Sequence, residues 1–124
     1  ELPFTAAARL SSDAVADSVS RLARVDSQIR IALNEAVEFE AGNESVKALE
    51  KYDPGGVFVY DLEVGEPAEA YFSASYLEKI VKAVKKLTDE VELRLTSDKP
   101  IRISPLFPGG QITYLVAPII YEVV

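Results

Sequence analysis

The chain of 124 residues repeats its own apolar pattern at an offset of half its length. The correspondence covers a stripe with helical spacing and the strand-like segment after it: Val15, Val19, Leu22 and Val25 match Leu77, Val81, Val84 and Leu87, and Ile29, Ile31 and Leu33 match Val91, Leu93 and Leu95. The turn-forming segment Asp53-Pro54-Gly55-Gly56 marks the middle. We therefore expect a single domain made of two repeats, about 1–55 and 56–124. A duplicated unit is typical of a scaffold rather than of an enzyme built around a pocket.

Each repeat combines one helix with several strands. Apolar residues spaced three and four apart predict helices from about residue 13 to 25 and from 74 to 87, each preceded by a serine that can cap it. Alternating patterns predict strands over 2–10, 28–31, 37–40, 46–49, 57–64, 68–73, 90–95, 99–104 and 112–120. The predicted class is α+β, an internal βαβββ duplication whose two helices pack on one face of an antiparallel sheet.

Composition excludes most catalytic chemistry. The chain contains no His and no Cys, so the commonest general base near neutral pH and the thiolate nucleophiles and zinc ligands are missing. A carboxylate-rich segment holds Asp61, Glu63, Glu66 and Glu69, but it lacks the fixed spacing of a calcium loop and is interpreted as a solvated connection. No apolar run is long enough to span a membrane. We therefore expect no enzyme, no cofactor, no metal site and no membrane partner.

Motifs in three places resemble the carboxy-terminal domain of proliferating cell nuclear antigen (PCNA), the sliding clamp of archaea and eukaryotes. The opening Glu1–Thr5 is similar to the exit from the linker between the two clamp domains, and Tyr76-Leu77 with Lys82-Ala83 is similar to the second helix. The run Gly110–Pro118 is similar to the last strand, which commonly ends in Leu-Ala-Pro. The resemblance implies the DNA-clamp fold and the role of a processivity factor, which encircles duplex DNA in replication and repair. An archaeal clamp would work in the cytoplasm and a eukaryotic one in the nucleus.

A set of basic side chains has the spacing of one helix face. Lys79, Lys82 and Lys86 are three and four residues apart, and Lys85 lies beside them. The resemblance implies that these lysines, with Arg24 of the first helix, face DNA phosphates without reading sequence. A solvated helix face without any ligand is the alternative. The net charge of −7 argues against DNA binding by a free monomer, whereas a closed ring would hold DNA by topology.

Two further sites follow from the resemblance. The groove for clamp-interacting peptides of DNA polymerase, flap endonuclease and DNA ligase would include Pro100, Leu115, Ala117, Pro118 and Ile120, although these residues can also simply finish a core strand. An edge strand would pair with the next subunit of a trimeric ring, which a clamp loader places on DNA. Its residues are Ser45, Val46, Lys47, Ala48, Leu49, Glu50 and Lys51. The lysines at 47 and 51 can equally protect an exposed edge, and Asp17 and Arg21 can pair within the first helix or across the subunit contact.

The rival interpretation is a peptide-recruiting interaction module without a role on DNA. The two differ in geometry, because a clamp requires that the lysine-bearing helices share one face, opposite the sheet that carries the peptide groove. Two departures from the family also stand out. The family usually ends in an acidic tail soon after Ala-Pro, whereas this chain continues after Ala117-Pro118 with Ile119–Val124. The loop Pro105–Gly110 is apolar where relatives tend to be charged.

Overall fold

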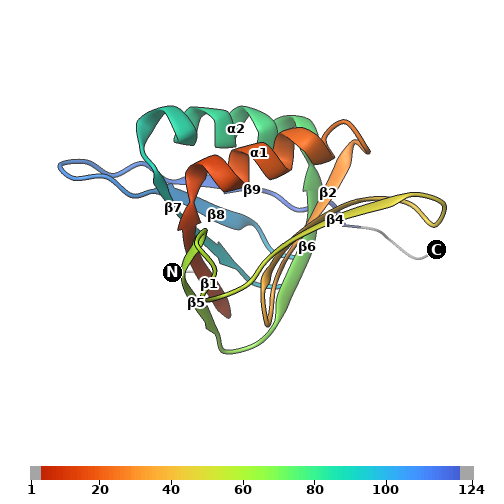
Figure 1. Ribbon diagram of the computed structural model, residues 1–124, viewed down its shortest axis with the longest axis horizontal. Helices are drawn as coiled ribbons and strands as arrows, with labels where there is room; N and C mark the ends of the chain where they lie inside the picture. The colour runs from red at the N-terminus through yellow and green to blue at the C-terminus, as the bar shows by residue number, and fades with distance from the viewer. Residues whose placement is uncertain (1–3, 121–124) are drawn as a thin grey trace.

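The computed structural model describes residues 4–120 (Figure 1). Its elements, in chain order, are β1 (Ala6–Ser11), α1 (Ser12–Leu22), β2 (Gln28–Leu33), β3 (Val37–Gly42), β4 (Lys47–Tyr52), β5 (Val59–Val64), β6 (Ala68–Ser73), α2 (Ala74–Leu87), β7 (Glu90–Leu95), β8 (Ile101–Pro105) and β9 (Tyr114–Val116). The start of the first predicted strand, most of the linker-like opening Glu1–Thr5 and the terminal residues 121–124 lie outside the described residues.

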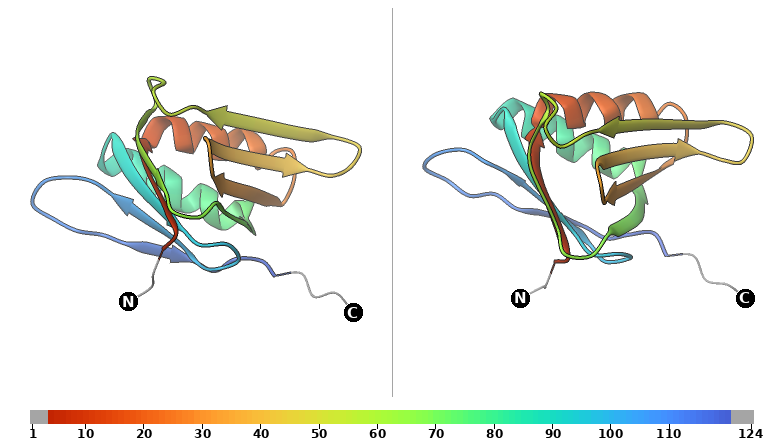
Figure 2. Two further views of the ribbon diagram at one scale, coloured as in Figure 1. Left: turned by 90° about the horizontal axis from the view of Figure 1, so that it is seen from below. Right: turned by 60° about the horizontal axis from the view of Figure 1, so that its bottom comes forward.

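The strands form two antiparallel sheets, and the two helices lie side by side across them (Figures 1 and 2). One sheet has the order β5-β1-β7-β8-β9 and the other β4-β3-β2-β6. The predicted α+β class with two adjacent helices is confirmed. The strands divide between two sheets instead of forming the single predicted one, and each helix packs on both: α1 contacts β1 and β3, and α2 contacts β8, β9 and β6.

The half-length offset of the sequence reappears in the elements. β1, α1 and β2 begin at Ala6, Ser12 and Gln28, and their counterparts β6, α2 and β7 begin at Ala68, Ala74 and Glu90. Each repeat also contributes the strand that precedes its helix to the other repeat's sheet, since β1 pairs with β7 and β6 pairs with β2. Each sheet therefore contains strands from both halves of the chain. The repeat boundary near residue 55 stays a prediction.

Both helices begin where the sequence predicts a cap. The Ser11 hydroxyl accepts a hydrogen bond from the Ala14 N–H at 3.2 Å, and the Ser73 hydroxyl accepts one from the Tyr76 N–H at 3.4 Å. The first helix ends at Leu22, three residues earlier than predicted, because the N–H groups of Val25 and Asp26 both bond to the Leu22 carbonyl and close a turn. Val25, predicted to be part of the apolar stripe, is consequently 41% exposed.

The core lies between the helices and the inner faces of the sheets. Leu77, Val81 and Val84 of α2 and Val15, Val19 and Leu22 of α1 are buried there, as the apolar stripes predict. Phe39 of β3 and Phe72 of β6 are fully buried among them. Leu87, predicted to complete the α2 stripe, is instead 46% exposed at the end of the helix. The faces that the helices leave to solvent or a ligand are otherwise mainly polar. None of the helices in the described part of the chain combines the length and apolarity needed to cross a membrane.

The last strand is much shorter than the predicted 112–120. β9 covers only Tyr114–Val116, and Pro118 lacks the N–H that further pairing along β8 would need. The chain instead crosses to the other sheet, where the Ile119 N–H donates to the Tyr71 carbonyl at 2.7 Å. The terminal residues thus link β9, at the edge of one sheet, to β6, at the edge of the other.

Candidate functional site

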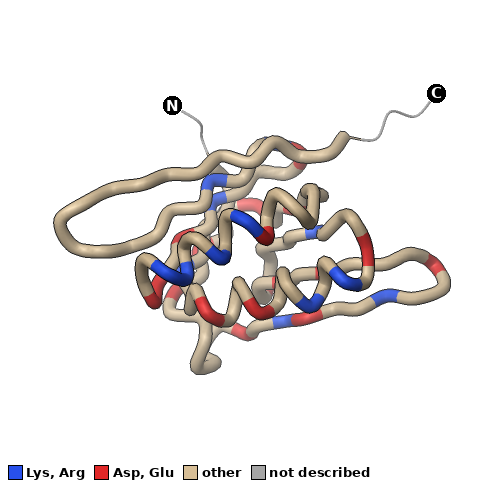
Figure 3. The backbone as a smooth tube through the Cα atoms, turned by 90° about the horizontal axis from the view of Figure 1, so that it is seen from above, with Lys and Arg blue, Asp and Glu red and all other residues tan. Residues whose placement is uncertain are grey.

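The outer surface of the helix layer carries the predicted basic residues. We use "helix layer" for α1, the turn 23–25 and α2. Lys79, Lys82, Lys85 and Lys86 are all exposed on α2, which lies beside α1. Figure 3 looks down on this layer and shows basic and acidic positions along both helices. The arrangement that the clamp interpretation requires, with both helices on one side of the molecule, is present.

Two of the four lysines are paired with carboxylates. The Lys82 Nζ lies 3.4 Å from a Glu78 oxygen one turn away, and the Lys85 Nζ lies 3.5 Å from an Asp17 oxygen on α1. These exposed pairs contribute little to stability and are easily exchanged for other anions. Lys79 and Lys86 make no ion pair within residues 4–120, so their charges are free for an incoming anion.

Arg24 lies outside the helix on which it was predicted. It follows the end of α1, in the turn where its N–H donates to the Arg21 carbonyl at 3.2 Å, and its side chain is exposed. Its side chain therefore does not continue the register of the α2 lysines. The alternative predicted for Asp17 and Arg21, a pair within α1, is wrong: Asp17 pairs with Lys85 of α2 and Arg21 pairs with Glu50 of β4.

Charge is unevenly distributed between the helix layer and the rest of the chain. Residues 12–25 and 74–87 contain six basic and three acidic side chains, whereas the remaining sequence contains seven basic and seventeen acidic ones. The layer therefore has a formal charge of +3 within a chain of net charge −7. A field of this kind attracts a polyanion to one side of the molecule and repels it from the other.

The predicted edge strand is an edge in the structure. β4 pairs only with β3 among the described strands, with Gly42 opposite Lys47 and Val37 opposite Tyr52. Lys47, Ala48, Leu49, Glu50 and Lys51 lie in this strand. Ser45 and Val46 precede it in the hairpin turn, where their N–H groups donate to the Asn43 side-chain oxygen. The outward N–H and C=O groups of β4 are thus available to another strand.

The inner side of β4 is tied to α1 by a polar network. Arg21 donates two hydrogen bonds to the Glu50 carboxylate, at 2.8 and 2.5 Å, and the Ser18 hydroxyl donates a third at 2.8 Å. The Tyr52 hydroxyl lies 2.6 Å from that of Ser18. The hydrogen bonds from Arg21, and secondarily that from Ser18, lower the pKa of Glu50 even though burial opposes the shift. The network holds the edge strand in a fixed position against the helix layer.

The sequence interpretation missed this network. Glu50 was predicted only as a member of the edge strand, and Ser18 and Tyr52 were given no role. The alternation of the strand gave one signal that Glu50 points inward. Ala48, Glu50 and Tyr52 share one face of the strand, and Lys47 and Lys51 lie on the other. A carboxylate on the inward face of a strand needs a cation, and the sequence alone does not say which one reaches it.

The predicted peptide-groove residues gather near the junction of the two sheets. Ile101 pairs with Val116, so Pro100 and Ala117 adjoin the same rung of the β8–β9 ladder. Leu115 and Ile120 are each 57% exposed, and Ala117 is also exposed. Pro118 is partly buried where the chain crosses toward β6. Exposed apolar side chains of this kind, on a strand and its extension, are suited to contact apolar anchors of a partner.

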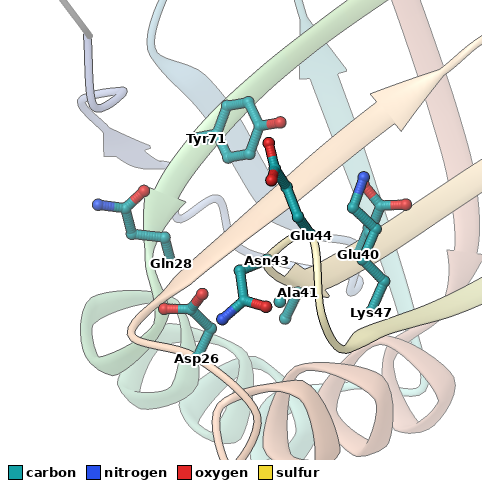
Figure 4. A pocket seen from close by; sticks show the side chains of 9 residues that line it. Asp26, Gln28, Glu40, Ala41, Asn43, Glu44, Lys47 and Tyr71 are labelled. Carbon is teal, nitrogen blue, oxygen red and sulfur yellow. The ribbon is translucent and has the colours of Figure 1, made fainter.

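A shallow concavity of about 540 Å³ lies on the outer face of the smaller sheet (Figure 4). It is lined by Asp26, Gln28, Glu40, Ala41, Gly42, Asn43, Glu44, Lys47 and Tyr71. Two of its carboxylates already have partners, since Glu40 lies 3.1 Å from Arg30 and Asp26 accepts a hydrogen bond from the Ser27 N–H. Among residues 4–120 no group of three or more carboxylates is arranged to hold a metal ion, and the segment with Asp61, Glu63, Glu66 and Glu69 is no exception.

Comparisons with known proteins agree with this geometry. Residues 1–119 match the protein-family model described as proliferating cell nuclear antigen, C-terminal domain. The DNA polymerase sliding clamp 1 of Pyrobaculum aerophilum is 34% identical over 117 residues, which are 93% of this chain and 47% of that protein. The DNA polymerase sliding clamp of Thermofilum pendens is 28% identical over 128 residues, 95% of this chain and 49% of the relative.

The fold has a close counterpart among solved structures. The crystal structure of PCNA from Thermococcus kodakaraensis superposes with a TM-score of 0.85 at 24% identity, over 96% of this chain and 49% of that one. This chain therefore spans about half the length of the relatives it matches. The helices, the two sheets and the family match over residues 1–119 lead to one conclusion: the chain belongs to the family of the C-terminal domain of PCNA.

Proposed function

We propose that this chain is a domain of a sliding clamp, a processivity factor that encircles duplex DNA and tethers replication and repair enzymes to it. The observation that carries the proposal is the location of positive charge. The helix layer has a formal charge of +3, whereas the rest of the chain is strongly acidic. Relatives named DNA polymerase sliding clamp come from Pyrobaculum aerophilum and Thermofilum pendens, and we propose the archaeal cytoplasm as the setting in which this chain works.

In this mechanism, the helix layer faces the phosphates and no bond is made or broken. Lys79 and Lys86 are free to contact phosphates, and Lys82 and Lys85 can exchange their exposed carboxylate partners for them. Such contacts are independent of base sequence and individually weak, which permits sliding. The acidic remainder of the chain prevents tight binding elsewhere, so retention on DNA comes from ring closure.

Ring closure is assigned to the free edge of β4. A strand of a neighbouring domain would pair with it and continue the four-stranded sheet into the next unit, as in a trimeric ring of intact clamps. The network of Arg21, Glu50, Ser18 and Tyr52 supports this role, because it fixes the edge strand relative to the DNA-facing helices. Ring geometry and the position of the helices would then be set together.

Tethering is assigned to the exposed apolar residues near the chain end. Leu115, Ala117 and Ile120 would contact apolar anchors of peptides from DNA polymerase, flap endonuclease and DNA ligase. The partly buried Pro100 and Pro118 would form the base of this peptide groove. The clamp loader would use the same outer side to place the ring on DNA. Leu115 alternates with the buried Val116 and so lies on the face of the sheet that points away from the core, where a bound enzyme would not compete with DNA on the helix layer.

The proposal can be tested on the chain itself by titrating ¹⁵N-labelled protein with duplex DNA at low salt. We expect backbone resonances of α2 and of the turn 23–25 to shift, and those of the outer sheet faces to stay unchanged. Replacing both Lys79 and Lys86 by Glu should weaken the shifts. The slope of log binding constant against log salt concentration should fall by about one for each phosphate that is no longer neutralised. Lys99→Glu, at an exposed lysine outside the helix layer, is the matched control.

Two results would speak against the proposal. Shifts confined to the sheets would place the DNA contact on the wrong side. An absence of shifts in the helix layer even at low salt, where weak phosphate contacts are strongest, would favour an interaction module that recruits peptides and has no role on DNA.

A further inference from the structure

We infer that the free edge of β4 accepts a strand in which two carboxylates flank an apolar side chain, so that its partner is an acidic segment of another domain rather than a second copy of β4. The inference rests on the ring-closing role proposed above and adds the chemistry of the partner strand.

The outer face of β4 carries three exposed side chains two residues apart. Lys47, Leu49 and Lys51 form this "edge stripe", and Leu49 is 51% exposed. Lys47 makes no ion pair within the described residues. The Lys51 Nζ is 3.9 Å from an Asp53 oxygen, and both of these side chains are more than half exposed. Both positive charges are therefore available to an incoming strand.

The inner face of the same strand does not select the partner strand by its charge. The Glu50 carboxylate is already neutralised by Arg21 and bonded to Ser18, and the Tyr52 hydroxyl is bonded to Ser18. Selection between partner strands consequently depends on the edge stripe. A carboxylate directly opposite a lysine across two strands is stabilising, and a second lysine at that position is destabilising.

The edge stripe is symmetric about Leu49, which decides how copies of the chain interact. If two β4 strands paired antiparallel about Leu49, Lys47 of each would lie opposite Lys51 of the other. This arrangement produces two like-charge pairs and disfavours a dimer formed through β4. A carboxylate, apolar, carboxylate pattern at alternate positions gives two attractive pairs and an apolar contact with Leu49 in either strand direction.

The free edge of β9 in a second copy does not supply this pattern. Its outward residue is Leu115, which is 57% exposed, and the flanking same-face positions are Thr113 and Ala117. These side chains offer Leu49 an apolar neighbour but offer the lysines no carboxylate.

The edge strands β5 and β6 do not supply the pattern either. Asp61 and Glu63 of β5 are exposed at neighbouring positions on the same face, with no apolar side chain between them on that face. If one of them lay opposite a lysine of the edge stripe, the other would lie opposite Leu49 or beyond the end of the stripe. The exposed face of β6 carries a single carboxylate, Glu69, which already pairs with Arg30 at 3.0 Å. The partner strand is therefore expected to lie outside the described part of this chain.

The test uses two synthetic peptides designed to pair as strands. Every second residue is Thr, which forms one face, and the residues between them form a face that differs between the two peptides. The variable face reads Glu, Val, Glu in one peptide and Lys, Val, Lys in the other. Each is titrated into the ¹⁵N-labelled 124-residue chain, and the resonances of residues 47–52 are followed. We expect the Glu peptide to bind about tenfold more tightly than the Lys peptide at low salt, from two cross-strand charge pairs that change sign.

The double substitution Lys47→Glu and Lys51→Glu should reverse this preference, whereas Lys99→Glu should leave it unchanged. Equal binding of the two peptides, or a preference of the unmodified chain for the Lys peptide, would overturn the inferred charge pattern while leaving β4 as a strand acceptor. If neither peptide shifted the β4 resonances, both the charge pattern and the ring-closing role of this edge would be overturned. The DNA titration of the helix layer would remain a separate test of the clamp function.

Discussion

Replacing Glu50 by Gln should weaken the attachment of the edge strand to α1 in a pH-dependent way. Gln keeps the size of the side chain but removes the charge that accepts two hydrogen bonds from Arg21. Charge-assisted hydrogen bonds contribute about 1.5–3 kcal/mol when buried. Because the Arg21 side chain is 56% exposed, we expect a loss of only about 1 kcal/mol at neutral pH, after allowance for solvent screening. For a chain of this size that corresponds to a fall in Tm of about 3–5 °C.

The pH dependence follows from the lowered pKa of Glu50, which is caused first by the Arg21 hydrogen bonds. A carboxyl whose pKa is lower in the folded state stabilises the fold at every pH above its unfolded value of about 4.3. That contribution disappears as the pH falls through the folded-state pKa. The stability difference between the unmodified chain and Glu50→Gln should therefore be constant near neutrality and vanish in acid.

Urea unfolding followed by circular dichroism, repeated from neutral to acidic pH, measures this difference directly. Glu44→Gln is a suitable control, because Glu44 is exposed in the hairpin turn and makes no ion pair within residues 4–120. Arg21→Gln should cause a similar loss, and the double variant should lose little more than either single variant. A difference that stayed the same at all pH values would refute the assignment of the stabilisation to the charged carboxylate.

Two further predictions concern the hairpin and the helix layer. Gly42→Ala should cost about 3 kcal/mol or more in thermal unfolding, because Gly42 has a φ of +124° and an added Cβ would lie 2.0 Å from the Val46 carbonyl oxygen. Gly55→Ala, with a φ of +90° and no neighbouring atom within 4 Å, should cost only about 1 kcal/mol, and equal losses would contradict the role of the close contact. Asp17→Asn should change the free energy of unfolding by less than about 0.5 kcal/mol, because its pair with Lys85 is exposed. The same change should strengthen binding of the helix layer to duplex DNA in a fluorescence titration, and weaker binding would count against a DNA-facing layer.

Local patterns in the sequence predict most of the elements but not how the strands are partnered. The stripe Leu77, Val81 and Val84 locates α2, and the half-length offset relates β1, α1 and β2 to β6, α2 and β7. The division into two sheets could not be predicted, because β1 pairs with β7 from the opposite half of the chain and alternation does not specify a partner. The last strand was predicted too long because apolar residues continue past Pro118, where the pairing along β8 has already ended.

The candidate sites were predictable to a different degree. The exposure of the α2 lysines follows from helix spacing, and the edge position of β4 follows from the family resemblance. The ion-pair partners of individual side chains do not follow from the sequence, because Arg21 of α1 pairs with Glu50 on β4 and Asp17 pairs with Lys85 on the other helix. Such contacts depend on the packing of whole elements, which a one-dimensional pattern does not contain.

The two halves exchange the strands that precede their helices, which gives the chain the architecture of a swapped dimer whose two copies have been joined end to end. Neither half can complete its sheet without a strand from the other, so the two halves must fold and unfold together. The predicted joint is the exposed turn Asp53–Gly56, which lies between β4 and β5 and contributes nothing to the buried interior. Cleaving the backbone there would leave two fragments that stay associated, because each contributes one β-strand to the sheet of the other.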